Sequence, residues 1–241
     1  MKISIIVPAF NEEKLIKQTL ARILESASAF ADFGFEFELI VCDNNSSDQT
    51  SAIAKEHGAI VVFEKVNQIA RARNTGASAA TGDWLLFIDA DSHPNRDLFR
   101  AVAREIQSGR TIGGGATIRP DEPILFVVLV THLWNFISRL KHWAAGSFIY
   151  CESAAFRQLG GFSEKLFATE EIEFSIRLKK LAQLHTRKVV IIRSFPLITS
   201  VRKFHLYSAF EHTRFLLKTA LRPKTVLRQR EECALWYDGR R

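Results

Sequence analysis

The sequence predicts an α/β fold in which a mostly parallel central sheet is flanked by helices. Apolar strand-like segments alternate four times with helix-like segments within the first ninety residues. This alternation is typical of parallel strands joined by right-handed crossovers. Acidic side chains follow three of these strands, at Glu12, at Asp43, and at Asp89 with Asp91. Because ligands of such sheets bind beyond the carboxyl ends of the strands, we expect the functional site there.

The elements expected in the first half follow from apolar periodicity and from turn residues. The expected strands are Lys2–Phe10, Phe37–Cys42, Ala59–Phe63 and Trp84–Ile88. The expected helices are Glu12–Ser28, a segment ending at Lys55, and Ile69–Ala80. Asn11 is the expected N-cap of the first helix, and Ser47 or Asp48 that of the second, because their short polar side chains can accept from free backbone N–H groups.

The second half is less regular. The expected helices are Asn95–Gln107, Ile124–Trp143, Ser153–Leu159, Thr169–Leu181 with Thr169 as a cap, and His205–Leu221. The expected strands are Phe148–Cys151 and Val189–Ile192. The run Gly113-Gly114-Gly115 indicates a flexible backbone or one that another segment approaches closely. No linker-like segment interrupts the chain, so we expect a single domain over residues 1–241.

Composition narrows the class of protein. Apolar residues make up 47% and charged residues 24% of the chain, as in ordinary globular proteins. The net charge of +7 suits anionic partners such as nucleotide phosphates, nucleic acid or anionic lipid, although a solvated basic surface is the simpler alternative. The three cysteines are far apart and form no CxxC pair, and the start of the chain lacks a leader pattern. We therefore expect a cytoplasmic protein with reduced thiols.

The sharpest local feature is the triplet Asp89-Ala90-Asp91 at the end of an apolar strand. In extended backbone, residues two apart share a face, so both carboxylates can point at one site. Carboxylate oxygens are hard donors that suit Mn²⁺ or Mg²⁺. Such triplets are common in loops by chance, and the position after the strand is what favours a metal site.

Five separate segments follow one another over about residues 1–180. They are Ile5–Glu13, Val41–Thr50, Ala70–Gly76, Asp89–Asp91, and Gly160-Gly161-Phe162 followed by Glu170-Glu171. In this order they resemble the family 2 glycosyltransferases, which have the GT-A fold. The resemblance implies a Rossmann-like nucleotide-binding half over about residues 1–110 and an acceptor-binding half over about residues 111–241. It also implies transfer of a sugar from a nucleotide-diphosphate sugar, UDP or GDP above others, to an acceptor hydroxyl, with inversion at the anomeric carbon.

The resemblance also implies roles for individual residues. The implied nucleotide contacts are Pro8, Phe10, Glu12, Asp43, Arg73, Asp89 and Arg202. The implied ligands of Mn²⁺ or Mg²⁺ are Asp89, Asp91 and His205. Each has a structural alternative: Glu12 as an acid in the first turn of a helix, Asp43 as a turn residue, Arg73 as a solvated helix residue, and His205 as a structural histidine.

The implied catalytic base lies in the pair Glu170-Glu171. The family pattern here is Glu-Asp, with the second carboxylate as base, so this chain departs from it by one methylene. A glutamate can abstract the same proton, and we assign Glu171 as the base with Glu170 as the second candidate. Acidic residues that complement a helix dipole are the structural alternative.

Two other functions compete with this assignment. A nucleic-acid-associated protein would explain the basic charge, but the sequence lacks the aromatic and basic motifs of an RNA-binding sheet, so we expect no nucleic-acid partner. A catalytically silent sugar-nucleotide binder would keep the fold, yet Asp89, Asp91 and Glu171 are all present.

The apolar stretch Ile124–Ile137 is too short to cross a membrane. Together with Arg139, Lys141 and Trp143 it is typical of a segment that lies at an anionic lipid interface. A buried core helix is the alternative. A peripheral contact at the inner face of the membrane would suit a lipid-linked acceptor.

Overall fold

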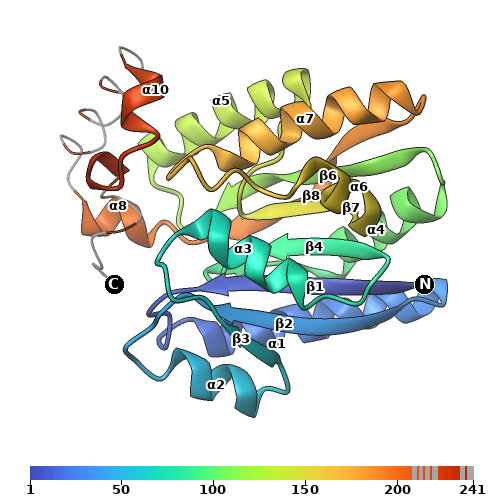
Figure 1. The fold of residues 1–241 in the computed structure, drawn as a ribbon, viewed down its shortest axis with the longest axis horizontal. Helices are drawn as coiled ribbons and strands as arrows, with labels where there is room; N and C mark the ends of the chain where they lie inside the picture. The colour runs from blue at the N-terminus through green and yellow to red at the C-terminus, as the bar shows by residue number, and fades with distance from the viewer. Residues whose placement is uncertain (208–210, 212–213, 215–217, 219–221, 234–236, 238–241) are drawn as a thin grey trace.

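The structure is a computed structural model that describes residues 1–207, 211, 214, 218, 222–233 and 237. One sheet with the strand order β3-β2-β1-β4-β7-β6-β8-β5 runs through these residues (Figure 1). Four of its seven neighbouring pairs in the described chain are parallel. The predicted class, a largely parallel sheet flanked by helices, is confirmed.

The first four strands are all parallel, and their carboxyl ends therefore lie at one edge. They are β1 (Lys2–Ala9), β2 (Glu36–Asp43), β3 (Ile60–Phe63) and β4 (Trp84–Ile88). The register pairs Ala9 with Asp43 and Asp43 with Phe63, so the ends are nearly level. Strand β1 is almost wholly buried because helices cover both of its faces.

The second half extends the sheet with mixed pairing. Its strands are β5 (Ser92–His93), β6 (Thr111–Pro120), β7 (Phe148–Glu152) and β8 (Lys188–Thr199). Strand β7 is antiparallel to β4 and to β6, whereas β6 and β8 are parallel. Strand β8 is much longer than the expected Val189–Ile192 because it continues past its apolar part along β6 and turns to pair with β5.

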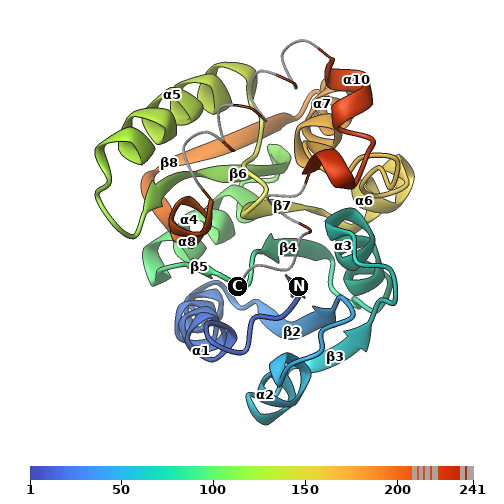
Figure 2. The same cartoon turned by 90° about the vertical axis from the view of Figure 1, so that its left-hand side faces the viewer.

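Two apolar layers cover the sheet (Figure 2). Helices α1 (Ile16–Ala27), α2 (Thr50–Glu56) and α4 (Arg96–Gln107), with the 3₁₀ turn η1 (Ser28–Phe33), pack on one face. Helices α3 (Ile69–Ser78), α6 (Ser153–Leu159) and α7 (Glu170–Leu184) pack on the other. Short elements α8 (Arg202–Leu206), α10 (Pro223–Val226) and η2 (Glu231–Cys233) follow. The expected helix His205–Leu221 falls largely outside the described residues.

A small third cluster joins the end of the chain to the middle. Cys233 and Tyr237 pack with Ala168, and the Phe167 and Tyr237 rings meet edge to face with centroids 5.5 Å apart. The backbone N–H of Phe167 donates to the carbonyl of Leu227 at 2.7 Å. The segment just before α7 is thus held from the C-terminal side.

The structure differs from all three predicted caps. Helix α1 begins at Ile16 rather than Glu12, and Asn11 is left-handed with φ 51° and accepts from the backbone N–H of Ser47 instead of capping. The N-cap position of α2 is Gln49 rather than Ser47 or Asp48. Thr169 does occupy the N-cap position of α7, but it has φ 64° and makes no capping hydrogen bond. At Asn11 and Thr169 loop contacts, which local sequence patterns do not contain, set the backbone.

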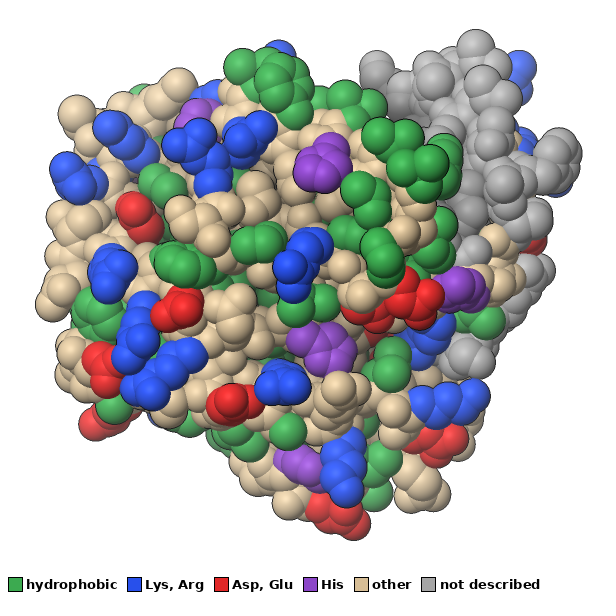
Figure 3. All heavy atoms as spheres, turned by 180° about the vertical axis from the view of Figure 1, so that it is seen from behind, with side chains coloured by type: hydrophobic (Ala, Val, Ile, Leu, Met, Phe, Trp, Pro, Cys, Tyr) green, Lys and Arg blue, Asp and Glu red, His purple; other side chains and the backbone are tan. Residues whose placement is uncertain are grey.

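Helix α5 (Leu125–Lys141) lies outside the two layers and packs beside β6. Its only buried residues are Val127 and Ser138, so the expectation of a fully buried helix is wrong. Hydrophobic side chains gather over it along the upper edge of Figure 3. The exposed apolar residues are Leu125, Phe126, Leu129, Val130, Leu133, Phe136 and Leu140.

No helix in the described part of the chain combines the length and the apolar character needed to cross a bilayer.

The glycine run lies within β6, where other backbone approaches it. A Cβ atom on Gly114 would overlap the carbonyl oxygen of Val190 in β8, and one on Gly113 would meet the backbone of β7. Of the two predicted alternatives, close approach is therefore the correct one.

We expect Gly114→Ala to destabilise the protein by about 1–3 kcal/mol, because the added methyl group must push two paired strands apart. The free energy of unfolding in urea measures the effect. Gly58→Asn is the matched control, since Gly58 has φ 76° with open space around it and asparagine tolerates this conformation. Equal stabilities of the two variants would contradict the packing argument.

Candidate active site

A cavity of about 500 Å³ lies beyond the carboxyl ends of β1 and β4. The loop after β1, helix α3, the turn after β4, helix α5 and the start of α7 all contribute to its wall. The predicted site residues that line it are Pro8, Phe10, Glu12, Arg73, Asp89, Asp91, Glu170 and Glu171. Residues from distant parts of the sequence therefore meet where a parallel sheet places its ligands.

Arg73 is the centre of the site. Its guanidinium donates to Glu170 Oε1 at 2.7 Å, to Asp89 Oδ1 at 3.0 Å and to the Gly146 carbonyl at 2.9 Å. The side chain is 3% exposed, and its guanidinium lies over the Phe162 ring, 5.3 Å from the ring centroid. The structural alternative for Arg73, a solvated helix residue, is wrong, because α3 turns this side chain into the sheet edge. Arg73 joins the predicted metal turn to Glu170, the second candidate for the base.

The two carboxylates at the start of α7 differ in surroundings. Glu170 is buried against Arg73, and burial raises its pKa even though the charge of Arg73 opposes the shift. Glu171 is half-buried on the cavity wall, and burial followed by the charge of Glu170 raises its pKa to about 8. Glu171 is thus the more accessible carboxylate, and it is poised to exchange a proton near neutral pH.

The backbone just before this pair is strained. Thr169 has φ 64°, a left-handed conformation that a β-branched side chain rarely adopts. Such strain persists only where the surroundings hold it, and it is concentrated at functional sites. Here the packing of Phe167 and Ala168 on one side and the Arg73–Glu170 ion pair on the other fix the turn.

The triplet Asp89–Asp91 forms a turn and not the extended segment that we expected. The Ser92 N–H donates to the Asp89 carbonyl at 3.1 Å, which closes the turn around the buried Ala90. Both aspartates are half-buried, and both line the cavity. The backbone carbonyl of Asp91 accepts from Ser200 N, so the segment after β8 folds back onto this turn.

Glu12 and Arg202 meet although they lie at opposite ends of the chain. Arg202 Nη2 donates to Glu12 Oε1 at 2.7 Å, and both side chains are largely buried. Glu12 lines the cavity, and Arg202 lies behind it. The pair ties the loop after β1 to the start of α8.

Asp43 and His205 lie away from the cavity wall in the described structure. Asp43 Oδ1 accepts from the Ser46 N–H at 2.9 Å, so this carboxylate serves the turn after β2. His205 Nε2 is 3.0 Å from Glu122 Oε2, and both side chains are exposed. No three His, Cys, Asp or Glu side chains in the described residues form a ready metal-binding cluster. Of the three predicted metal ligands, Asp89 and Asp91 line the cavity and His205 does not.

Some lining residues escaped prediction. Trp134 and Thr131 of α5, Gly146 and Asn67 also line the cavity. A Cβ atom on Gly146 would lie 3.3 Å from Arg73 Nη2 and 3.5 Å from the Glu171 carboxyl carbon, so a larger residue there would crowd both groups. Of these four residues, only Trp134 had a local sequence feature that could have indicated a site, because it is the one tryptophan within a largely aliphatic helix.

The chain is similar to known proteins in sequence and in fold. A model of the family "Glycosyl transferase family 2" matches residues 4–159. The chain is 25% identical over 202 residues to the probable glycosyltransferase YdaM of Bacillus subtilis, covering 75% of this chain and 47% of YdaM. It therefore spans about half the length of that relative.

Two solved structures share the fold. Staphylococcus aureus TarS 1-349 in complex with UDP-GlcNAc superposes with a TM-score of 0.66 at 17% identity, covering 99% of this chain and 71% of that one. The mannosyltransferase PcManGT from Pyrobaculum calidifontis, in complex with GDP-Man and Mn²⁺, gives 0.66 at 22% identity, covering 91% and 61%.

The raised pKa of Glu171 predicts a pH-dependent stability. The unfolded chain releases this proton near its ordinary pKa of 4.5, whereas the folded chain keeps it until about pH 8. The folded state should therefore lose stability as the pH rises across this range. We expect Glu171→Gln to lose less stability than the wild type in urea titrations with EDTA. The control Glu56→Gln, at an exposed position of α2, should lose stability with pH as the wild type does. The same dependence of the free energy of unfolding on pH in all three proteins would contradict the raised pKa of Glu171.

Proposed function

The chain belongs to glycosyl transferase family 2, and from this premise we propose that it moves a sugar from a nucleoside-diphosphate sugar to an acceptor hydroxyl. The observation that carries the proposal is the Arg73 network, which brings Asp89 and Glu170 together beside Asp91 and Glu171 on one cavity wall. A metal-binding turn and a proton acceptor facing one cavity are what this reaction requires.

The donor would lie along the ends of β1 and β4. Pro8, Phe10 and Glu12 line the part of the wall nearest β1, where a base and ribose would fit, and Arg202 backs Glu12. Asp43 would act there indirectly, by holding the turn after β2. UDP and GDP are the favoured nucleotides because the similar TarS and PcManGT structures hold a UDP-sugar and a GDP-sugar.

The residues present fit a hard divalent cation. Asp91 has no hydrogen-bond partner for its side chain among the described residues and lines the cavity, so it would be the direct ligand of Mn²⁺ or Mg²⁺. Asp89 is turned toward Arg73 and would act from beside the ion. When bound, the ion would stabilise the negative charge that develops on the diphosphate leaving group. His205 faces Glu122 and remains only a prediction as a ligand.

Glu171 would act as the base. The acceptor oxygen attacks the anomeric carbon while its proton passes to the Glu171 carboxylate, and the bond from that carbon to the diphosphate oxygen breaks with its electron pair. A single displacement of this kind inverts the anomeric centre. The buried Arg73–Glu170 pair would hold the start of α7 so that Glu171 faces the cavity.

We further propose that α5 contacts the surface of a membrane, which would place a lipid-linked acceptor beside the cavity. Seven of its apolar side chains are exposed, and Leu125 is 74% exposed. A second flank carries Val127 and Trp134 into the cavity wall, and the exposed Val130 lies where the two flanks meet. A peripheral location at the inner face of the membrane follows if the protein is cytoplasmic. Failure of the wild-type protein to sediment with lipid vesicles at low salt would contradict it.

Removing either aspartate should lower transfer strongly, because a small site loses a hard ligand or the partner of Arg73. We expect Asp91→Ala to raise the metal concentration for half-maximal activity, and Asp89→Ala to lower thermal stability as well, since it leaves part of the buried Arg73 unpaired. Donor hydrolysis with Mn²⁺ or Mg²⁺ measures the first effect. Undiminished activity in EDTA would rule out the metal.

Glu171→Gln keeps the shape of the side chain and removes its basicity. We expect transfer to fall by at least about 10²-fold, with donor affinity nearly unchanged, because general-base help is typically worth about 10²–10⁴-fold. Single-turnover transfer and product NMR measure the rate and the anomeric configuration. Normal transfer by Glu171→Gln, with loss in Glu170→Gln, would move the base to the neighbour. A product with retained configuration would exclude the single displacement.

A further inference from the structure

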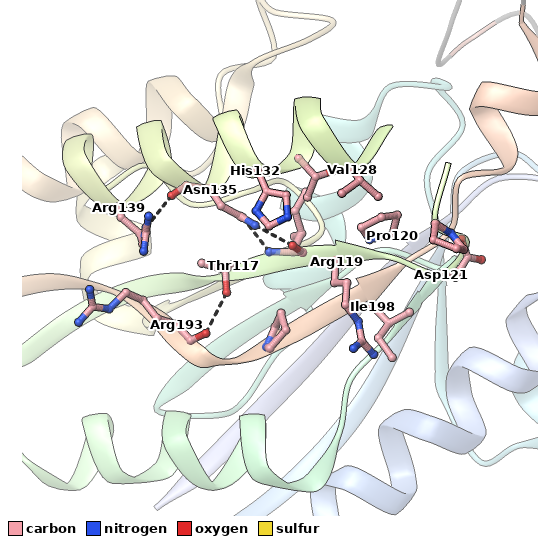
Figure 4. Close-up of a pocket in the computed structure, with 14 residues that line it drawn as sticks. Thr117, Arg119, Pro120, Asp121, Val128, His132, Asn135, Arg139, Arg193 and Ile198 are labelled. Carbon is pink, nitrogen blue, oxygen red and sulfur yellow. Dashed lines mark hydrogen bonds between the residues drawn. The ribbon is translucent and has the colours of Figure 1, made fainter. Parts of the chain in front are cut away.

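Helix α5 has three flanks with different neighbours. One flank is exposed and apolar, and a second lines the donor cavity. The third carries His132, Asn135 and Arg139 into another cavity of about 650 Å³, between α5 and strands β6 and β8 (Figure 4). Asn135 fixes this flank, because its side-chain amide both accepts from and donates to the backbone of Ile118 in β6.

A further cavity of about 570 Å³ continues from this one toward α7. Arg139 and Arg193 line both cavities, and Figure 4 shows these two side chains together at one end of the α5 cavity. We call the two adjoining cavities the basic groove. Its basic lining residues are Arg119, His132, Arg139, His142, Lys179, Arg187, Lys188 and Arg193, and the one carboxylate that lines it is Asp121, at the far end.

The positive charge of the basic groove is largely uncompensated. In the described structure Arg119, Arg139, Lys188 and Arg193 take part in no ion pair, whereas the arginines elsewhere that approach buried surfaces, such as Arg73 and Arg202, each have a carboxylate partner. Of the groove residues, Arg187 alone is neutralised, by Glu152. Like charges held along one depression repel each other and attract an anion. The guanidinium group fits phosphate oxygens in particular.

We infer that the basic groove binds the phosphate groups of anionic lipid headgroups while the exposed flank of α5 rests in the bilayer. The inference extends the proposed membrane contact and names the lipid chemistry. Figure 3 shows hydrophobic side chains over α5 and Lys and Arg side chains gathered beyond them on the same face. An apolar helix flank bordered by cations is the arrangement that binds an anionic interface, since the two parts reach the acyl and the phosphate layers together.

A soluble polyanion would need only the cations. Its binding would not depend on Leu129 or Leu133, which are 60% and 61% exposed and lie on the flank that faces away from the groove. Binding to an anionic lipid surface requires both the cations of the basic groove and the apolar flank of α5. Variants of the groove and variants of the apolar flank, tested separately, therefore distinguish a lipid surface from a soluble polyanion.

The experiment is sedimentation of the full chain with vesicles of phosphatidylcholine alone or mixed with phosphatidylglycerol. We expect binding to the mixed vesicles, weakened at least about tenfold in Arg139→Gln/Lys188→Gln/Arg193→Gln because each cation near an anionic surface contributes. The matched control, Lys17→Gln/Lys55→Gln/Arg104→Gln, removes the same charge from exposed positions on α1, α2 and α4. It should bind like the wild type, and Arg139→Lys/Arg193→Lys should retain binding.

Leu129→Ser/Leu133→Ser should also lose vesicle binding. Equal effects of the groove variant and its control, or undiminished vesicle binding by the leucine variant, would overturn the inference. Calorimetry with UDP and GDP runs in parallel. Intact nucleotide binding with no vesicle binding by the wild type refutes the membrane contact and the groove together and leaves the proposed donor site standing. Vesicle binding without nucleotide binding refutes the proposed donor site alone.

Discussion

The buried guanidinium of Arg73 is the constraint on which the arrangement of the site depends. A charge at this depth is tolerated only when carboxylates and a carbonyl surround it, and Glu170, Asp89 and Gly146 supply them. These partners come from α7, from the turn after β4 and from the loop before β7. One side chain of α3 therefore sets the relative positions of three segments that are far apart in the sequence.

The same interaction places the two carboxylates of each acidic segment in different surroundings. Asp89 and Glu170 compensate the cation, and their neighbours Asp91 and Glu171 remain on the cavity wall. Adjacent acidic residues would otherwise repel each other at this density. The raised pKa of Glu171 reflects first the burial of its carboxyl group and then the charge of the neighbouring Glu170. The two carboxylates that Arg73 binds and their two neighbours thus line one cavity, and the first two hold the others in place.

The sequence was most informative where structure is local. Trp84–Ile88 and Ser153–Leu159 have the bounds expected from apolar runs and turn residues, because burial of continuous strands and capped helices leaves a periodic signature. The antiparallel insertion of β7, the burial of Arg73 and the left-handed Thr169 had no such signature, since partners 16 to 97 residues away impose them. The family resemblance predicts that Asp89, Asp91 and Glu171 belong to one site, and all three line the cavity. The resemblance does not predict that Asp43 binds the backbone of Ser46 or that His205 pairs with Glu122, and these contacts keep both side chains off the cavity wall.

The cluster of Phe167, Ala168, Cys233 and Tyr237 bears on the order in which the molecule assembles. During synthesis the parallel half of the sheet emerges first and can close from nearby contacts, whereas β6 pairs with β7 and gains its second neighbour only when β8 is made. The segment before α7 waits longer still, because Leu227 and Tyr237 lie some sixty to seventy residues downstream of it. A nascent chain thus holds a nearly finished sheet while the wall that carries Glu170 and Glu171 is still open, so the fold forms before the cavity is complete.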